Sequence, residues 1–318
     1  MRRGYIIHNK NHNCFDDIVA ALALSENRDY QLMLSNTWRF EFNKESKKIG
    51  ESIYNSSPNN QKLLRDVHGI NFIYKKDIEH LKQYFYCYIE KYRYIAVNID
   101  TFYCIWDKSY NQFHNTNHTV LCANINMKDE LVYVHDPFYE KYNEKIDFAT
   151  FLKAFNGVYF FEIHSIIEGQ RMNIYTDVIS DLMDTLHCIN NINNFIKVLI
   201  DIDIAFERDG IVNIWHCPIM INLYRIQLNR LRYTIFLKYI NQNTNINILN
   251  YIKELEEISY DWERIRNNIF KLIYYNDKKY LMGIINLINL VKDKEYNTCV
   301  SIIDVFTKRY EDLEIIKK

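Results

Sequence analysis

The stretch Asn11-His12-Asn13-Cys14-Phe15 decides how the rest of the chain is interpreted, because its cysteine stands where a polar segment gives way to a helical pattern. Apolar residues recur at helical spacing over 15–24, and two aspartates fall in the first turn. A thiol at a helix N-terminus faces unpaired N–H groups and the positive end of the helix dipole, which favours the thiolate. The pattern therefore predicts that Cys14 is a nucleophile.

Two strand-length runs downstream supply a histidine and an aspartate. His118 opens the run 118–125, and Asp136 stands at the end of the run 131–135, with a short polar connection between the two runs. In an antiparallel hairpin both residues would lie at the same end of the sheet, on neighbouring strands about 5 Å apart. The pattern predicts a catalytic triad in which the Cys14 thiolate attacks, the His118 imidazole moves the proton and the Asp136 carboxylate orients the ring. This is the layout of a papain-like cysteine protease fold.

The remaining pattern predicts an α+β fold with an antiparallel sheet, followed by an all-helical C-terminal region. From about Arg171 apolar residues recur every three or four positions, which is typical of amphipathic helices. We therefore expect a papain-like catalytic domain over 1–168 and a helical domain over 169–318 that covers the active site. The expected strands are 38–42, 94–100, 118–125, 131–135 and 158–164, and the expected helices are 15–24, 76–91, 147–155, 211–240, 255–272 and 281–291.

Composition narrows the class of protein. The 318 residues carry 39 Lys and Arg against 40 Asp and Glu, a net charge of −1, so we expect no nucleic-acid partner. With only seven glycines, the chain has no phosphate-binding glycine loop. Seven cysteines without a C-x-x-C pair, and no signal peptide or transmembrane run, predict a reduced cytoplasmic protein without a membrane partner.

Several motifs together resemble the butirosin-biosynthesis BtrH N-terminal family. They are His12-Asn13-Cys14 opening a helix, Asn98-Ile99-Asp100 followed by Tyr103 and His114, the strand led by His118, and Val132-Tyr133-Val134-His135-Asp136-Pro137. The stretch 251–276, with Trp262, is similar to the helical C-terminal part of such proteins. The resemblance covers most of the chain.

The resemblance implies a papain-fold acyltransferase, distantly similar to a group of cysteine peptidases. It implies that an acyl or peptidyl group moves from the phosphopantetheine thioester of an acyl or peptidyl carrier protein, through Cys14, to an amine in natural-product biosynthesis. The protein itself would hold no cofactor and no metal, since the phosphopantetheine is carried on the donor.

Other residues are candidates for the oxyanion hole and for amine binding. The backbone N–H of Cys14 is one oxyanion donor, and papain-like enzymes place a side-chain donor about six residues earlier, here His8 flanked by Asn9. Asp100 with Tyr103 is a candidate amine anchor, although an aspartate at the end of a strand also caps turns.

Arg225 and Arg232 are candidates for contacting the carrier protein, because they fall on one polar stripe of an expected helix. The alternative is that this stripe is simply a solvated helix face.

Several alternatives stay open at this level. The same triad would serve a cysteine peptidase or amidase, and a chain that has lost activity would be a carrier- or peptide-binding module. His12 and His114 compete with His118 as the base. A zinc site formed by His8, His12, Cys14 and His118 is disfavoured because the paired, closely spaced ligands of structural zinc sites are missing.

Overall fold

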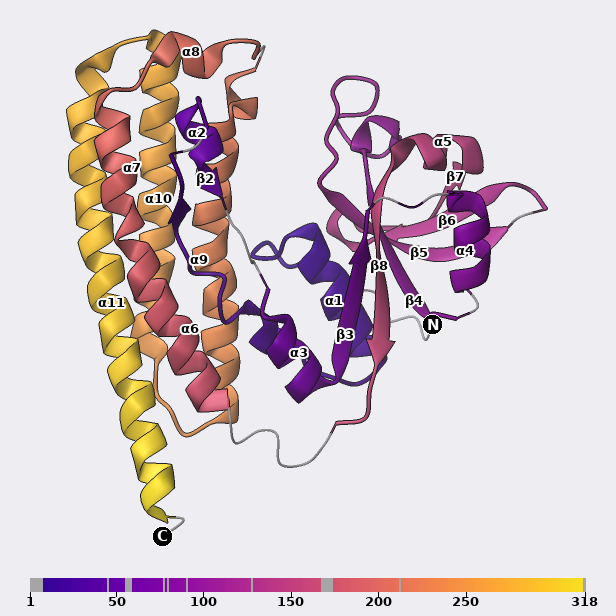
Figure 1. Cartoon of the computed structure of the whole chain (residues 1–318), viewed down its shortest axis with the longest axis horizontal. Coiled ribbons are helices and arrows are strands. Elements are labelled where there is room, and N and C mark those ends of the chain that lie inside the picture. The colour runs from indigo at the N-terminus through magenta and orange to yellow at the C-terminus, as the bar shows by residue number, and fades with distance from the viewer. Residues whose placement is uncertain are drawn as a thin grey trace. The chain divides into compact units, whose positions relative to one another are not determined.

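The fold is described from a computed structural model of residues 8–44, 46–54, 59–76, 78, 80–89, 91–126, 128–166, 174–211 and 213–316. The chain divides into two compact units (Figure 1). The first comprises Met1–Tyr30 and Gln61–Glu168, and the second comprises Gln31–Asn60 and Gly169–Lys318. Residues 31–60 thus belong with the helices, whereas the sequence-based boundary had assigned them to the first domain.

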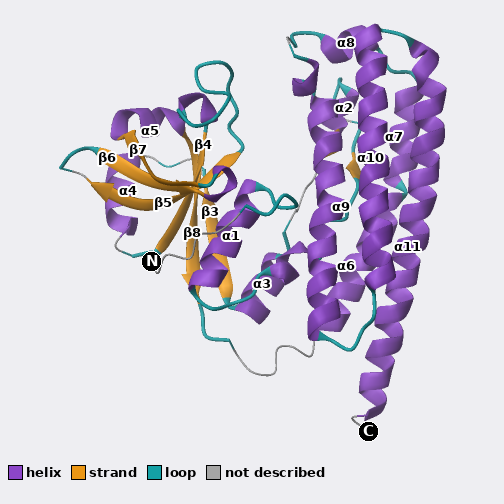
Figure 2. Ribbon diagram, turned by 180° about the vertical axis from the view of Figure 1, so that it is seen from behind, coloured by secondary structure: helices purple, strands orange, loops and turns teal. Residues whose placement is uncertain are grey.

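The first unit is built on a six-stranded antiparallel sheet in the order β3-β8-β4-β5-β6-β7 (Figure 2). The strands are β3 (Ile70–Lys75), β4 (Tyr94–Ile99), β5 (His118–Asn126), β6 (Leu131–Asp136), β7 (Lys141–Asp147) and β8 (Phe155–Ile163). The helices of this unit are α1 (Cys14–Ser25), α3 (Gln61–His68), α4 (Leu81–Ile89) and α5 (Phe148–Ala154).

Each face of the sheet buries a different set of side chains, because strand residues alternate between the faces. On one face the α4 and α5 residues Phe85 and Phe151 pack in the core with strand residues such as Val97 and Val134. On the other face, Phe15 of α1 packs against Phe72, Tyr159 and Phe161 of β3 and β8. The sheet therefore holds the start of α1 against its strands.

The second unit contains long packed helices. Its helices are α2 (Ile49–Ser52), α6 (Ile174–Ile189), α7 (Asn191–Ile200), α8 (Ile204–Arg208), α9 (Pro218–Asn243), α10 (Leu249–Tyr275) and α11 (Leu281–Ile316), and a small ribbon pairs β1 (Glu41–Phe42) with β2 (Ile53–Tyr54). In its core Arg230 donates two hydrogen bonds of 2.9 Å to Glu295, and Trp262 also donates to Glu295. The guanidinium and the carboxylate neutralise each other and fill each other's hydrogen-bonding capacity. Together with the bond from Trp262, this buried ion pair holds α9, α10 and α11 in register.

The expected fold class is confirmed at this level: a mixed α+β unit with an antiparallel sheet, followed by helices. The sequence pattern did not predict β3 and β7, which are the two edge strands of the sheet. In β7 only Ile146 is buried, so the alternation that marks a strand is weak there. The expected strand at 38–42 is reduced to Glu41–Phe42. Within the described part of the chain, none of the helices has the length and apolar character needed to cross a membrane.

Candidate active site

The start of α1 is fixed by a capping box that places Cys14 at the first helical position. The Asn13 side chain accepts a hydrogen bond of 2.8 Å from the Asp16 backbone N–H, and the Asp16 carboxylate accepts one of 3.0 Å from the Asn13 N–H. This reciprocal pairing is a strong helix start, and two aspartates in the first turn complement the helix dipole. The local sequence therefore determines where the thiol stands.

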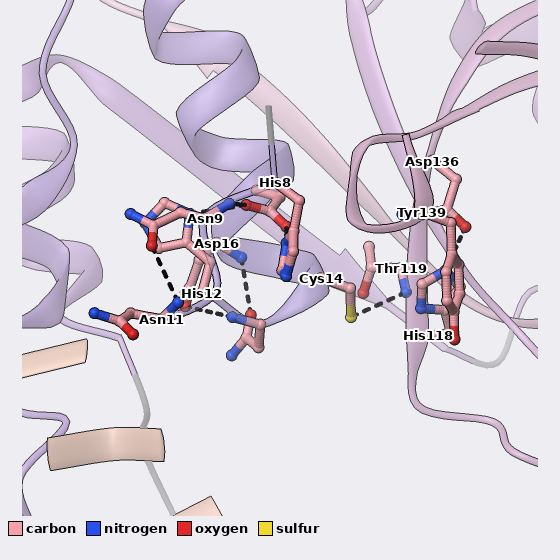
Figure 3. A network of polar contacts seen from close by, with 12 residues as sticks. His8, Asn9, Asn11, His12, Cys14, Asp16, His118, Thr119, Asp136 and Tyr139 are labelled. Carbon is pink, nitrogen blue, oxygen red and sulfur yellow. Dashed lines mark hydrogen bonds and ion pairs between the residues drawn. The ribbon is translucent and has the colours of Figure 1, made fainter. Parts of the chain in front are cut away.

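The Cys14 thiol lies against the start of β5 (Figure 3). The Thr119 backbone N–H donates to Cys14 Sγ at 3.3 Å, and Sγ lies 3.7 Å from the Asn117 carbonyl oxygen, to which a protonated thiol donates. The side chain is only partly buried. A partly exposed sulfur with a backbone donor beside it fits a reacting thiolate.

His118 and Asp136 meet at the same end of the sheet, as the hairpin pattern predicts. His118 Nε2 lies 2.6 Å from Asp136 Oδ2, and the two residues are 5% and 0% exposed. Trp106 Nε1 donates to the same carboxylate oxygen at 2.8 Å, and the Tyr139 backbone N–H donates to Oδ1 at 3.3 Å. Because Nε2 is engaged by Asp136, Nδ1 is the ring nitrogen available to Cys14.

The electrostatics of the pair favour a thiolate and an imidazolium. Burial alone would raise the pKa of the Cys14 thiol, but the hydrogen bond and charge of His118, with the Thr119 N–H, lower it below its ordinary value. Burial alone would lower the pKa of His118, but Asp136 and Cys14 raise it to about 10. Opposite charges in contact stabilise each other, which is how cysteine nucleophiles are activated.

A second carboxylate, that of Asp107, is linked to the His118 ring through Tyr139. The Tyr139 ring centroid lies 5.4 Å from that of His118, and its hydroxyl is hydrogen-bonded to Asp107. Asp107 is itself buried and held by Ser109, whose N–H and Oγ donate to it at 2.7 and 2.6 Å. Trp106, Asp107 and Tyr139 therefore position the pair. The sequence analysis missed them, although Tyr139 follows Asp136 by only three residues.

His8 lies near the His118 side of the site and Asn9 does not. The rings of His8 and His118 both contact Phe138, with centroid distances of 4.5 and 5.9 Å. Asn9 is exposed, accepts a hydrogen bond from the Asn11 N–H, and lies on the side of His12, away from Cys14 (Figure 3). Of the two oxyanion candidates, the geometry favours His8.

The buried carboxylate of Asp17 holds both N-terminal histidines. It lies 2.6 Å from His8 Nδ1 and 2.8 Å from His12 Nδ1, while His12 Nε2 is hydrogen-bonded to the Tyr30 hydroxyl. His12 is thus used locally and does not compete as the base. An imidazolium carries a proton on both nitrogens, so His8 in that form would donate from Nε2 to an oxyanion.

We expect His8→Ala to slow acylation by about 10²-fold and His8→Gln to stay within about tenfold of the wild type, since a glutamine amide also donates a hydrogen bond. Single-turnover rates with a small thioester measure this. Equal losses in both variants would contradict an oxyanion role and favour His8 as a proton acceptor.

Asp100 organises a loop and is not an exposed amine anchor. Its Oδ1 accepts from the backbone N–H groups of Phe102 and Asn115 at 3.1 and 2.9 Å, and its Oδ2 lies 2.5 Å from His114 Nδ1. Although burial alone would raise the pKa of Asp100, these partners lower it. Asp100 therefore caps a turn, which was the alternative to its role as an amine anchor. Tyr103 borders a surface hollow.

The prediction that Arg232 contacts a carrier protein from an exposed face of α9 is wrong. Its side chain is 1% exposed and donates to Asn229 Oδ1 and Asn59 Oδ1 at 2.8 and 2.7 Å. It stabilises the helical unit, because a buried guanidinium needs such acceptors. Arg225 is exposed and hydrogen-bonded to Asn222. A role of the helical unit in covering the active site or docking a carrier stays a prediction.

The zinc alternative finds no support in the geometry. Within the described ranges, no three His, Cys, Asp or Glu side chains are grouped as a metal site. The other described cysteines differ from Cys14 in chemistry, since burial raises the pKa of Cys104, Cys122, Cys188, Cys217 and Cys299.

No protein-family model matches the chain, and no curated protein matches its sequence. The resemblance to the BtrH N-terminal family, and the activity that it implies, therefore stay predictions.

Proposed function

We propose that this protein is a cysteine acyltransferase with a papain-like catalytic unit, and that it forms amide bonds through an acyl-enzyme at Cys14. The observation that carries the proposal is the contact of a helix-start thiol of lowered pKa with a buried His118–Asp136 pair. Such an arrangement fits nucleophilic catalysis on an acyl group. The sequence resemblance supports transfer to an amine over hydrolysis.

The residues fit both half-reactions. In the first, Cys14 Sγ attacks the thioester carbonyl of a carrier-bound acyl group, the carbon–sulfur bond to phosphopantetheine breaks, and the His118 imidazolium protonates the leaving thiolate. In the second, an amine attacks the Cys14 acyl-enzyme, His118 takes the amine proton, and the Cys14 thiolate leaves. The phosphopantetheine arm belongs to the donor carrier protein and is part of the substrate. The acyl transfer resembles that of the amide synthase of closthioamide assembly.

Intact-mass analysis of the protein mixed with acyl-loaded carrier proteins tests this function. We expect an acyl adduct on Cys14 that disappears when a reactive amine is added, with the amide as product. Release of the free acid alone, whatever amine is offered, would instead make the protein a cysteine hydrolase. Absence of any adduct and of any product would favour the non-catalytic binding module.

A further inference from the structure

A hollow of about 610 Å³ lies on the sheet of the first unit, and two cations line it. Its lining includes side chains from the start of β4 and from β5, β6 and β7, among them Arg93, Asn124, Tyr133, His135, Asn143 and Lys145. No acidic side chain is among the described residues that line it. The hollow therefore differs from the catalytic site in offering positive charge to a ligand.

Arg93 keeps hydrogen-bonding capacity for a ligand although it is paired. It donates to Glu26 at 2.8 Å, but its side chain is 71% exposed. A guanidinium has five N–H donors in a fixed fork, and one carboxylate occupies at most two of them. The other donors of Arg93 are therefore available to an anion.

Lys145 supplies the second positive charge. Its ammonium lies 5.8 Å from the ring centroid of Tyr133, which lines the same hollow. Lys145 also borders a smaller hollow with Asp147, but that carboxylate caps α5 by accepting a hydrogen bond from the Thr150 N–H and interacts with the charge of Lys153. Glu26 thus offsets one of the two cations of the larger hollow, and the charge of Lys145 remains.

The hollow and the reactive thiol lie at opposite ends of α1. Cys14 is the first residue of this helix, and its sulfur meets Thr119 at the start of β5. Glu26, the C-cap of the same helix, holds Arg93, and Ser25 Oγ lies 3.0 Å from the hydroxyl of Tyr94, which also lines the hollow. Since α1 has 12 residues and each adds about 1.5 Å, Arg93 lies about 18 Å from the thiol.

The strand register shows that the hollow extends along β5 away from Cys14. Leu121 follows Thr119 by two positions, on the same face of the sheet, and pairs with His135. Beyond the bulge in β5, Asn124 pairs with Tyr133. At about 3.3 Å per residue, the hollow begins about 7 Å beyond Thr119 and reaches to about 15 Å.

The middle of the hollow is polar and uncharged. His135 Nδ1 accepts a hydrogen bond of 3.0 Å from the Asn143 N–H. Burial lowers the pKa of His135 below its ordinary value, so the ring is neutral at pH 7 and carries its proton on Nε2. His135 and the side-chain amide of Asn124 can therefore bond to neutral polar groups between the two ends.

We propose that this hollow binds the phosphopantetheine arm of the acyl donor, with the phosphate at Arg93 and Lys145. The assignment rests on the proposed function, which makes a carrier-bound thioester the substrate. About 13 bonds separate the phosphorus from the sulfur of the arm, a span of about 16 Å when the arm is extended. This length matches the separation of Arg93 from Cys14, so a phosphate held there places the thioester beside the thiol. Arginine and lysine are the usual phosphate partners in proteins, and the two amides of the arm suit the polar middle of the hollow.

Calorimetric titration of the whole protein tests the site, with 4′-phosphopantetheine as one ligand and pantetheine, which lacks only the phosphate, as the other. We expect the phosphorylated compound to bind at least about tenfold more tightly at pH 7 and low salt. Lys145→Gln should remove most of that preference and leave the affinity for pantetheine unchanged, because glutamine keeps a polar side chain without the charge. Arg93→Gln should reduce the preference further, since it also leaves Glu26 without its partner.

Lys82→Gln is the control variant, because Lys82 is also an exposed lysine whose ammonium lies over an aromatic ring, that of Phe148, and it should change neither affinity. Equal binding of the two compounds, an unchanged preference in Lys145→Gln, or an equal loss in Lys82→Gln would overturn the proposal. Phosphate-dependent binding without any Cys14 adduct would keep this site and contradict the acyltransferase. A Cys14 adduct from a loaded carrier protein, without any preference for the phosphorylated compound, would do the reverse.

Discussion

Replacing Cys14 with alanine is expected to abolish acyl transfer and leave the fold intact. The sulfur is the only atom of the protein that bonds to the acyl group in the proposed mechanism, so turnover should fall by about 10⁴-fold or more. The side chain is only partly buried, at the first position of a helix whose start is fixed by Asn13 and Asp16. The free energy of unfolding should therefore change by less than about 1 kcal/mol. Steady-state rates and thermal unfolding measure the two effects.

Cys188→Ala is the control, because Cys188 is also a half-exposed free cysteine and its pKa is raised by burial. It should keep full activity. Cys14→Ser should be nearly as inactive as Cys14→Ala, since a hydroxyl is far less ionised than a thiol of lowered pKa. Substantial activity in Cys14→Ala would end the proposal, while equal losses in Cys14→Ala and Cys188→Ala would point to a general loss of folded protein.

The geometry of the triad could be predicted because local rules determine it. The capping box that begins α1 at Cys14 depends on only four consecutive residues. The β5–β6 hairpin brings His118 and Asp136 to one end of the sheet. Each of these features depends on neighbours in the sequence or on one strand pairing. The long separation between Cys14 and His118 in the sequence did not matter, since the start of α1 lies against the start of β5 in the fold.

The features that the sequence did not predict depend on tertiary packing. Helical spacing from Arg225 to Arg232 predicts one exposed stripe, but only Arg225 is exposed, whereas Arg232 is buried and donates hydrogen bonds to Asn59 and Asn229. The spacing of polar residues on a helix does not distinguish an exposed one from a buried one that has hydrogen-bond partners. Likewise, Trp106 and Asp107 come to the site only through the folding of a long loop, for which no periodicity exists.

Asp136→Asn should reduce acyl transfer by about 10²- to 10⁴-fold and also narrow its pH profile. In the wild type, Asp136 helps to raise the pKa of His118 to about 10, and the resulting imidazolium lowers the pKa of Cys14. The reactive ion pair therefore exists from a pH below the ordinary pKa of a cysteine thiol up to a pH of about 10. Without the carboxylate, the pKa of His118 should fall and the pKa of Cys14 should rise. The pH range in which the ion pair exists should therefore become narrower at both ends.

The rate of Cys14 alkylation by iodoacetamide as a function of pH separates this effect from a loss of folded protein, because it reports the thiolate directly. In Asp136→Asn the rise in rate should move to higher pH, and in His118→Ala it should move further, towards the ordinary thiol value.

His114→Ala is the matched control: His114 also pairs with a carboxylate, that of Asp100, but its side chain is 63% exposed. It should leave the alkylation profile unchanged. A profile that moves as far in His114→Ala as in His118→Ala would mean that the base is assigned to the wrong histidine. An unchanged profile in Asp136→Asn would mean that the carboxylate orients the ring without setting its charge.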